Sequence, residues 1–371
     1  MLTETLAPPL RLLAKETAGG DQHSGGKSPA IATETLVGFD WTSVKRVLLV
    51  RLRSIWDTVL MTACLHALRT WRPDIEISVV IEPLSAPILE KHPLVDNLIV
   101  AGRSTGERAR LIRSLRRSRY DLAVNMHGGA TAAIVTALSG AGTTVGYEGL
   151  SQSWMLKTRA PAPDVILGRR EIHSVEQQLA LLHWLGMPFP QKPTTTLVVP
   201  EHSRAIVRAR LSGFLAQYRG DRFALIAPCA AFESKQWPAA SFAAVTRHIN
   251  DRWRLPGVVI AGPGQEETAR EVAAAAGPGA HSLTGISVTE LMALSEMAGI
   301  FIGNDSGPMH IAAAFDRPIV VTFGPSNPSV WHPWSGAAYR VIRSAGIAQI
   351  KIGDVTGAVD ELLDESHELH E

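Results

Sequence analysis

Residues 300–323 read IFIGNDSGPMHIAAAFDRPIVVTF, and this stretch contains the pattern that decides the fold. A short apolar run at 300–303 leads into small polar residues, then an apolar segment with helical spacing at 307–315, then a second apolar run at 319–323. A strand, a helix and a strand in this order form a βαβ unit, whose two strands are parallel. The stretch therefore predicts a parallel sheet that is covered by helices.

The same alternation continues on both sides of this unit. Strands are predicted at 46–52, 75–81, 97–100 and 121–126, and again at 223–227 and 258–261, with helical segments between them. A stretch rich in Pro and Thr at 185–200 separates the two series. We expect fold class α/β, with two doubly wound domains that face a cleft. The expected parts are a flexible leader (1–43), an N-terminal domain (44–190), a C-terminal domain (191–345), and a C-terminal helix with an acidic tail (346–371).

Length and composition exclude several classes of protein. The 371 residues suggest two domains, and 46% hydrophobic residues can fill two cores, which excludes disorder of the whole chain. A net charge of +1 is too small to attract nucleic acid to the protein as a whole, so no nucleic-acid partner is expected. Two cysteines exclude a disulfide framework and favour the reducing cytoplasm. No apolar run is long enough to predict a transmembrane helix, and the leader lacks the pattern of a signal peptide.

Charge is distributed unevenly along the chain. Residues 44–190 contain 18 Lys/Arg and 12 Asp/Glu, a net charge of +6, whereas residues 351–371 have a net charge of −6. The N-terminal domain therefore suits an anionic partner. The arginine-rich segment 103–119 is either part of that attraction or an ordinary solvated helix face.

Two strand-to-helix junctions in the second half carry chemistry that suits a diphosphate. Asp305, Ser306 and Gly307 lie where a strand gives way to a helix, whose N-terminus favours phosphate; the alternative is a helix cap without a ligand. Lys235, in ESKQWP (233–238), follows another strand as a point charge for a diphosphate, or else as a solvated lysine.

Two further junctions place carboxylates after strands. A carboxylate in AGPGQEE (261–267), from Glu266 or Glu267, suits hydrogen bonds from ribose hydroxyls; both could instead be partners of a helix dipole. Asp57, in RLRSIWDT (51–58), is either a carboxylate base at the cleft or another dipole partner. All four junctions are expected at the carboxyl ends of strands, where open α/β sheets bind ligands.

Five segments resemble the ADP-heptose:lipopolysaccharide heptosyltransferases, glycosyltransferase family nine, and the resemblance extends over about residues 45 to 345. They are RVLLVRLRSIWDTVLMTACLHALR (46–69), YDLAVNMHG (120–128), HSVEQQLALLHWLG (173–186), ESKQWP (233–238) and GNDSGPMHIAAAFDRPIVVTFGPSNP (303–328). The resemblance implies a GT-B fold with two Rossmann-like domains, the C-terminal one for a nucleotide-sugar donor and the N-terminal one for the acceptor. It also implies an inverting transfer that needs neither metal nor cofactor.

The resemblance assigns roles residue by residue. Asp57 is similar to the general base and Lys235 to the group that stabilises the leaving diphosphate. The donor site would comprise Glu266, Asp305, Ser306, Gly307 and His310, where His310 either contacts the donor or only packs. Candidates for an anionic glycan or glycolipid acceptor are Arg51, Arg53, Trp56 and His127, although His127 could equally be a structural histidine. A cytoplasmic enzyme with peripheral contact to the inner membrane is implied.

The chain departs from the family pattern at two places. Trp56 stands where the family usually has Gly before the base, so an indole either stacks on a sugar or narrows the cleft. The loop at 228–231 reads PCAA, without the hydroxyl groups that often contact phosphate. These departures motivate an alternative, a non-catalytic protein of the same fold that binds nucleotide sugars. An oxidoreductase is disfavoured, because 262–267 lacks the third Gly of a dinucleotide fingerprint.

Overall fold

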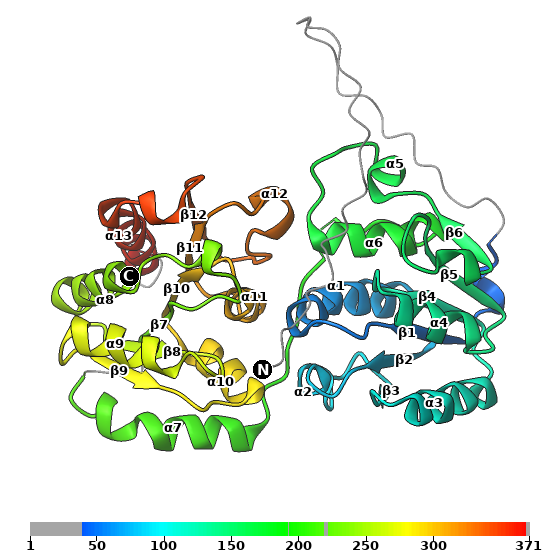
Figure 1. Cartoon of the computed structure of the whole chain (residues 1–371), viewed down its shortest axis with the longest axis horizontal. Coiled ribbons are helices and arrows are strands. Elements are labelled where there is room, and N and C mark those ends of the chain that lie inside the picture. The colour runs from blue at the N-terminus through cyan, green and yellow to red at the C-terminus, as the bar shows by residue number, and fades with distance from the viewer. Residues whose placement is uncertain (1–38, 192, 219–221, 369–371) are drawn as a thin grey trace, which may run out of the picture.

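The computed structural model describes residues 39–191, 193–218 and 222–368. The described chain contains two six-stranded parallel sheets, one in each half (Figure 1). The first sheet has the strand order β3-β2-β1-β4-β5-β6, and the second has the order β12-β11-β10-β7-β8-β9. When strands are numbered within their own sheet, both orders become 3-2-1-4-5-6, the doubly wound arrangement. The prediction of two doubly wound α/β domains is confirmed.

All strand pairs within each sheet are parallel. The first sheet consists of β1 (Arg46–Val50), β2 (Glu76–Ile81), β3 (Asn97–Val100), β4 (Leu122–Asn125), β5 (Thr143–Tyr147) and β6 (Thr158–Ala160). The second sheet consists of β7 (Ala224–Ala227), β8 (Gly257–Ile260), β9 (Ala280–Leu283), β10 (Ile300–Asn304), β11 (Ile319–Phe323) and β12 (Tyr339–Arg343).

Helices connect the strands and cover both faces of each sheet. In the N-terminal domain they are α1 (Ile55–Trp71), α2 (Ala86–Leu89), α3 (Thr105–Ser118), α4 (Ala130–Leu138), α5 (Pro163–Leu167) and α6 (Ser174–Trp184), with 3-10 turns η1 (Trp41–Ser43) and η2 (Ser153–Met155). In the C-terminal domain they are α7 (Glu201–Leu215), α8 (Ala239–Trp253), α9 (Glu266–Ala276), α10 (Val288–Met297), α11 (Gly307–Ala314), α12 (Pro328–Trp331) and α13 (Ile352–Glu368), with η3 (Glu233–Lys235) and η4 (Ile347–Gln349). None of these helices is both long and apolar enough to cross a bilayer.

The central strands are apolar throughout because both of their faces are buried. In β1, Val47 and Leu49 belong to one hydrophobic cluster, and Leu48 and Val50 belong to another on the opposite face. Successive side chains of a strand point to opposite faces, so an uninterrupted apolar run is what a doubly covered strand requires. The largest cluster contains residues of both domains, so the two sheets share a continuous apolar interior at their interface.

The edge of each sheet differs from the sequence expectation. Strands β6, β9 and β12 and helix α5 had no predicted counterpart. Strands β6, β9 and β12 lie at sheet edges and are only partly buried, so they lack the continuous apolar run of the central strands. Short edge strands owe their conformation to pairing with a neighbour, which periodicity alone does not reveal.

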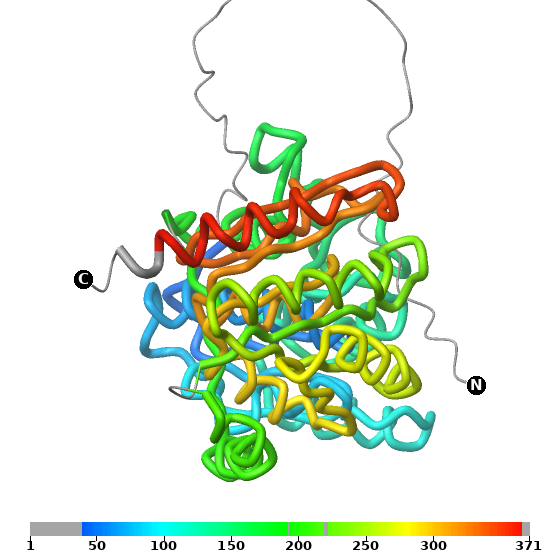
Figure 2. Tube along the Cα trace, turned by 90° about the vertical axis from the view of Figure 1, so that its left-hand side faces the viewer, coloured from blue at the N-terminus to red at the C-terminus, as the bar shows by residue number. Residues whose placement is uncertain are grey.

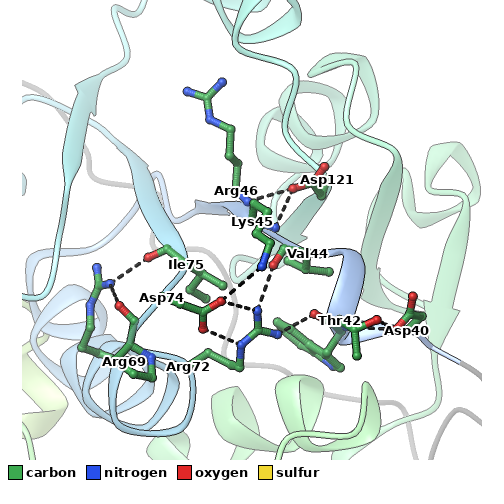
Figure 3. A network of polar contacts seen from close by, with 12 residues as sticks. Asp40, Thr42, Val44, Lys45, Arg46, Arg69, Arg72, Asp74, Ile75 and Asp121 are labelled. Atoms are coloured by element: carbon green, nitrogen blue, oxygen red, sulfur yellow. Dashed lines mark hydrogen bonds and ion pairs between the residues drawn. The ribbon is translucent and has the colours of Figure 1, made fainter.

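A network of charged groups closes the amino edge of the first sheet (Figure 3). The Asp121 carboxylate accepts the backbone N–H groups of Lys45 and Arg46 at 2.7 and 2.8 Å. The Arg72 guanidinium donates to both carboxylate oxygens of Asp74 and to the Val44 carbonyl. These groups pair with one another at the edge opposite the carboxyl ends of the strands. We therefore assign the network a structural role.

The last residues of the expected leader are folded. Trp41 is 8% exposed, packs edge-on against Trp71, and donates its indole N–H to the Leu185 carbonyl at 2.6 Å. Residues 1–38, the rest of that leader, lie outside the described residues. The folded N-terminal domain therefore starts by Phe39, ahead of the expected boundary at 44, because an indole so placed fills the gap beside α1.

Helix α13 lies along α8 on the outer side of the C-terminal domain (Figure 2). Its Val355, Val359 and Leu362 are buried in the apolar cluster that covers that face of the second sheet. The spacing of these three residues places them on one face of the helix, so α13 belongs to the core of this domain.

Contacts far apart in sequence hold the two domains together. Helix α1 packs on α11, and α2 packs on α10. The His173 Nε2 atom lies 3.0 Å from the His332 carbonyl oxygen, and the His173 ring stacks on Trp334 at 4.6 Å. In the connecting segment, the Thr196 N–H donates to the Thr62 hydroxyl at 3.0 Å. These contacts bring the carboxyl ends of the central strands of both sheets toward each other.

Candidate active site

Apart from Glu266, which follows β8, the predicted site residues lie near the two places where strand order reverses. In the first sheet this point is between β1 and β4, and in the second it is between β7 and β10. Helices leave the two neighbouring strands on opposite faces there, which opens a crevice at the carboxyl ends. Asp57 follows β1, and Asp305 follows β10.

Asp57 is the third residue of α1 and is held by groups of its own loop. Its Oδ2 atom accepts hydrogen bonds from the Ser54 N–H and hydroxyl, and lies 2.7 Å from Nη2 of Arg51. The Asp57 side chain is 24% exposed, so it still reaches solvent. Burial raises the pKa of Asp57, but the Arg51 guanidinium and the Ser54 N–H lower it more, and the pKa is below its usual value. The carboxylate is therefore ionised at neutral pH.

Arg51 and His127 complete this half of the site. Arg51 is 6% exposed and also donates to the Met126 carbonyl, so it joins the ends of β1 and β4. His127 is buried beside Gly129, and burial together with the Arg51 charge lowers its pKa to about 4. Arg53 pairs with a different carboxylate: its guanidinium lies 3.7 Å from the Glu82 carboxylate, which follows β2.

Lys235 and Asp305 form an ion pair in the other half of the site. Lys235 Nζ lies 2.7 Å from Asp305 Oδ2; the lysine side chain is 27% exposed and the aspartate only 5%. The lysine is placed by its neighbour Trp237, which is 1% exposed and donates its indole N–H to the Ile350 carbonyl. A buried tryptophan thus anchors the segment that presents the ammonium group.

The start of α11 contains polar atoms that lack partners. Ser306 is the N-cap residue but makes no capping hydrogen bond through its side chain. Ser306 Oγ and His310 Nδ1 are buried and have no hydrogen-bond partner within the described residues. Burial lowers the His310 pKa to about 4, while the nearby Asp305 and Asp57 carboxylates raise it less. Since both aspartates act on this ring, His310 lies near the Asp57 and Asp305 carboxylates.

Glu266 and Glu267 differ in their surroundings. Glu266 is half-buried, and its Oε1 accepts the Gly264 N–H at 3.1 Å, which helps to lower its pKa. Glu267 is exposed and pairs with Arg270 on the helix surface. The loop that carries Glu266 is tied to the 228–231 loop, because Gln265 donates to the Ala230 carbonyl at 3.0 Å. Glu266 is thus the less exposed of the two carboxylates, on a loop that is tied to the 228–231 loop.

Trp56 joins the two halves of the site. A Cβ atom built on Gly307 would lie only 1.7 Å from Cε2 of the Trp56 indole, so the ring lies directly on the Gly307 backbone. The turn of α1 that bears Asp57 is therefore in contact with the start of α11. The structure brings together Arg51, Asp57 and His127 on one side with Lys235, Asp305 and His310 on the other.

Sequence reasoning missed two buried amides near these residues. Asn304 is fully buried; its Oδ1 accepts the Trp237 N–H and the Thr322 hydroxyl, both at 2.9 Å, and its Nδ2 donates to the Pro228 carbonyl at 2.8 Å. Gln178 is 5% exposed, lines a small apolar pocket beside His127, and neither of its amide atoms has a partner within the described chain. Asn304 could have been noticed in the sequence, because it is an amide at the end of an apolar strand. No local sequence pattern marks Gln178.

Comparison with known proteins places the chain among sugar transferases. The model of glycosyltransferase family 9 (heptosyltransferase) matches residues 108–353. Lipopolysaccharide heptosyltransferase 3 of Escherichia coli is 29% identical over 338 residues, which cover 84% of this chain and 97% of the relative. Lipopolysaccharide heptosyltransferase 2 of Escherichia coli K12 is 27% identical over 81% of this chain and 88% of the relative.

Solved structures share the two-domain fold. A family 9 glycosyltransferase of Veillonella parvula has a TM-score of 0.78 at 23% identity, covering 88% of this chain and 98% of that chain. The ADP-heptose heptosyltransferase II of Escherichia coli has a TM-score of 0.73 at 24% identity, covering 87% and 99%. An Escherichia coli heptosyltransferase solved with ADP has a TM-score of 0.69 at 20% identity, covering 85% and 99%. At these identities the likeness concerns the fold.

Proposed function

Because this chain belongs to glycosyltransferase family 9, the heptosyltransferases, and is therefore a glycosyltransferase, we propose that it transfers a heptose or related sugar from an ADP-sugar to a glycan hydroxyl. The proposed acceptor is the lipopolysaccharide core or a similar glycan, as the names of the relatives suggest. The proposed donor is supported by solved structures of an Escherichia coli heptosyltransferase with ADP and with ADP-2-deoxy-2-fluoro heptose. We assign the donor to residues 191–345 and the acceptor to residues 44–190.

One observation supports this proposal: the turn of α1 that bears Asp57 touches the start of α11, and the Lys235–Asp305 ion pair lies next to that start. Asp57 extends from the end of β1, and Lys235 with the start of α11 lies at the ends of β7 and β10. The indole of Trp56, the residue before Asp57, touches Gly307 and so fixes how closely these elements approach. Base and diphosphate site on opposite sides of a crevice are what a single displacement at a sugar carbon requires.

In the proposed inverting step, the acceptor hydroxyl oxygen bonds to the anomeric carbon from the side opposite the diphosphate. The bond from that carbon to the diphosphate oxygen breaks, the ADP leaves with the electron pair, and Asp57 takes the hydroxyl proton. Lys235 and the N–H groups at the start of α11 stabilise the charge on the departing diphosphate. Because these groups supply positive charge where it develops, we propose that transfer needs no metal ion or other cofactor.

Asp57 acts as a base although its pKa is below the usual value. The ionised form is then fully present at neutral pH, but it is a weak base toward an ordinary alcohol. The acceptor proton becomes acidic only as its oxygen bonds to the sugar, so Asp57 accepts the proton late in the step. Arg51 keeps the carboxylate in place and charged until then.

Charge supports the proposed acceptor class. The N-terminal domain has a net charge of +6 between residues 44 and 190, and Arg51, Arg53 and His127 lie at the carboxyl ends of its strands. A phosphorylated or carboxylated glycolipid would be attracted to this domain. We further propose that the enzyme acts in the cytoplasm, peripherally at the inner membrane. Both cysteines, Cys64 and Cys229, are free and buried, which supports the reducing compartment.

The alternative is a protein that binds the nucleotide sugar without transferring it. The Trp56 contact with Gly307 and the loop 228–231, which lacks hydroxyl side chains, are the observations that favour it. The two functions share the donor site and differ only in whether Asp57 meets an acceptor.

The test compares Asp57→Asn with the unmodified enzyme in a transfer assay with ADP-heptose and lipopolysaccharide-core acceptors. General base catalysis contributes about 10²–10⁴-fold, so Asp57→Asn should lose that much activity and still bind ADP. Asp164→Asn is the matched control, because Asp164 is an exposed acid in the first turn of another N-terminal helix, α5. Unchanged activity of Asp57→Asn would refute the base. Binding of ADP-heptose by the unmodified protein, without turnover across an acceptor panel, would favour the alternative.

A further inference from the structure

The indole of Trp56 occupies the surface of α11 that faces the N-terminal domain. The ideal Cβ position at Gly307 lies 1.7, 1.8 and 2.1 Å from Cε2, Cδ2 and Cε3 of Trp56. Real Cβ atoms do not come closer than about 3 Å to other heavy atoms, so this contact exists only because residue 307 has no side chain. The ring of the first turn of α1 therefore lies flat on the first residue of α11.

The surface beneath the indole has the properties of an anion site. The N-terminus of an α-helix carries N–H groups without acceptors and a partial positive charge. Ser306 does not cap these groups, and its Oγ is buried without a partner in the described residues. His310, one turn along the same face, is 4% exposed, and its Nδ1 also lacks a partner there. Two unpartnered polar side chains at one helix start indicate that a ligand completes the site.

The indole and an anion cannot both occupy this surface. A phosphate that accepts hydrogen bonds from the first turn of α11 must come within about 3 Å of the backbone, and the ring already lies against that backbone at Gly307. Gly307 allows close approach by either one. Pro308 has no N–H and the Met309 N–H bonds to the Ser306 carbonyl. The Gly307 N–H is therefore the donor at issue. An apolar ring offers it no acceptor, whereas a phosphate provides acceptors and opposite charge. Binding therefore requires the ring to leave.

We propose that Trp56 is a determinant of donor affinity, whose indole competes with the diphosphate of the nucleotide sugar for the start of α11. This inference rests on the proposed function, because it takes the ADP-sugar as the ligand of this surface. The ring leaves either by a change of its own rotamer or by separation of α1 from α11. In both cases the contact between Trp56 and Gly307 is exchanged for contacts between Gly307 and the diphosphate.

The experiment measures ADP binding to the full-length protein by calorimetry. Trp56→Ala removes the competing ring and keeps a good helix former, so the Kd for ADP should fall at least fivefold. Trp56→Phe keeps a smaller ring on Gly307 and should lie between Trp56→Ala and the unmodified protein. The matched control is Trp154→Ala, since Trp154 is 70% exposed on η2, and its Kd should equal that of the unmodified protein.

A second measurement tests the contact without any ligand. Gly307→Ala should lower the Tm of the unmodified protein more than that of Trp56→Ala, because the new methyl group collides with the ring only when the ring is present. Equal Tm losses in both backgrounds would show that the ring is not on Gly307 in solution and would overturn the proposal.

The outcomes separate this proposal from the proposed function. If the unmodified protein binds ADP and transfers sugar but Trp56→Ala binds ADP equally or more weakly, the competition is refuted and the function stands. If neither protein binds ADP, the ADP-sugar donor is wrong and the competition is overturned with it. Tighter binding by Trp56→Ala, with Trp154→Ala unchanged, supports both.

Discussion

Replacing Asn304 with Ala should strongly destabilise the C-terminal domain, because one buried side chain makes three hydrogen bonds. Asn304 is the last residue of β10 and is fully buried. Its amide joins three segments that are distant in sequence: it bonds the Trp237 N–H of the lysine-bearing segment, the Thr322 hydroxyl of β11, and the Pro228 carbonyl after β7. Alanine can replace none of these bonds, and the site is too enclosed for water to do so freely.

The magnitude follows from the groups that are left unpaired. In Asn304→Ala the Trp237 N–H and the Pro228 carbonyl both lose the bonds that Asn304 supplies, and each buried unsatisfied group costs about 1–3 kcal/mol. The Thr322 hydroxyl keeps a long contact of 3.4 Å to the Gly303 carbonyl. The expected loss is about 2–6 kcal/mol, a large part of the roughly 5–15 kcal/mol that stabilises a native protein. Even the lower value corresponds to a fall in Tm of about 4–8 °C for a domain of this size.

The assay is urea unfolding of the full chain, followed by ADP calorimetry at a temperature where each variant is folded. Thr322→Val is the matched control, because it removes one hydroxyl from Asn304 but leaves both backbone groups bonded, and about 1 kcal/mol should be lost. ADP binding should weaken in Asn304→Ala, since the segment that presents Lys235 is released from β10. If Asn304→Ala costs no more stability than Thr322→Val, the amide does not join these segments and the reasoning is wrong.

Two predictions concern pH. Arg51→Met removes the charge that holds the Asp57 pKa below its usual value, while burial still raises that pKa. The acid limb of the pH profile of kcat/KM should therefore move to higher pH. A profile that superimposes on that of the unmodified enzyme would contradict the role of Arg51. Burial lowers the pKa of His310 from 6.5 to about 4 in the folded state. Between these two pH values the unfolded chain therefore binds a proton that the folded chain does not. The free energy of unfolding should fall as the pH is lowered from 6.5 toward 4. His310→Gln should flatten this decline of Tm, and equal slopes for both proteins would assign the decline to other groups.

Much of the architecture could be predicted from local patterns. The central strands are buried on both faces and so appear as apolar runs, and the longer helices appear as apolar residues at helical spacing. Strands β6, β9 and β12 could not be predicted in this way, because partly buried edge strands depend on their neighbours in the sheet. The Pro- and Thr-rich segment between the two series of strands marked the division into two parts.

The candidate site was predictable only as a set of positions. Asp57, Lys235, Glu266 and Asp305 each follow an apolar strand, and parallel strands bring such residues to one edge of a sheet. Residue type and position therefore suggested the roles, and the resemblance to a family assigned them. Whether each carboxylate lies toward the site was open, and the structure distinguishes Glu266, which is half-buried, from Glu267, which pairs with Arg270 at the surface.

The sequence by itself determined the elements, the parallel sheets and the junctions where ligands bind, because hydrophobic periodicity and turn residues are local properties. Only the tertiary structure decided which side chains meet. The ion pair of Lys235 with Asp305, the three bonds of Asn304, and the indole of Trp56 on Gly307 all join segments at least 18 residues apart in sequence. Such contacts depend on strand order and on how two domains pack, and these are properties of the whole chain in space.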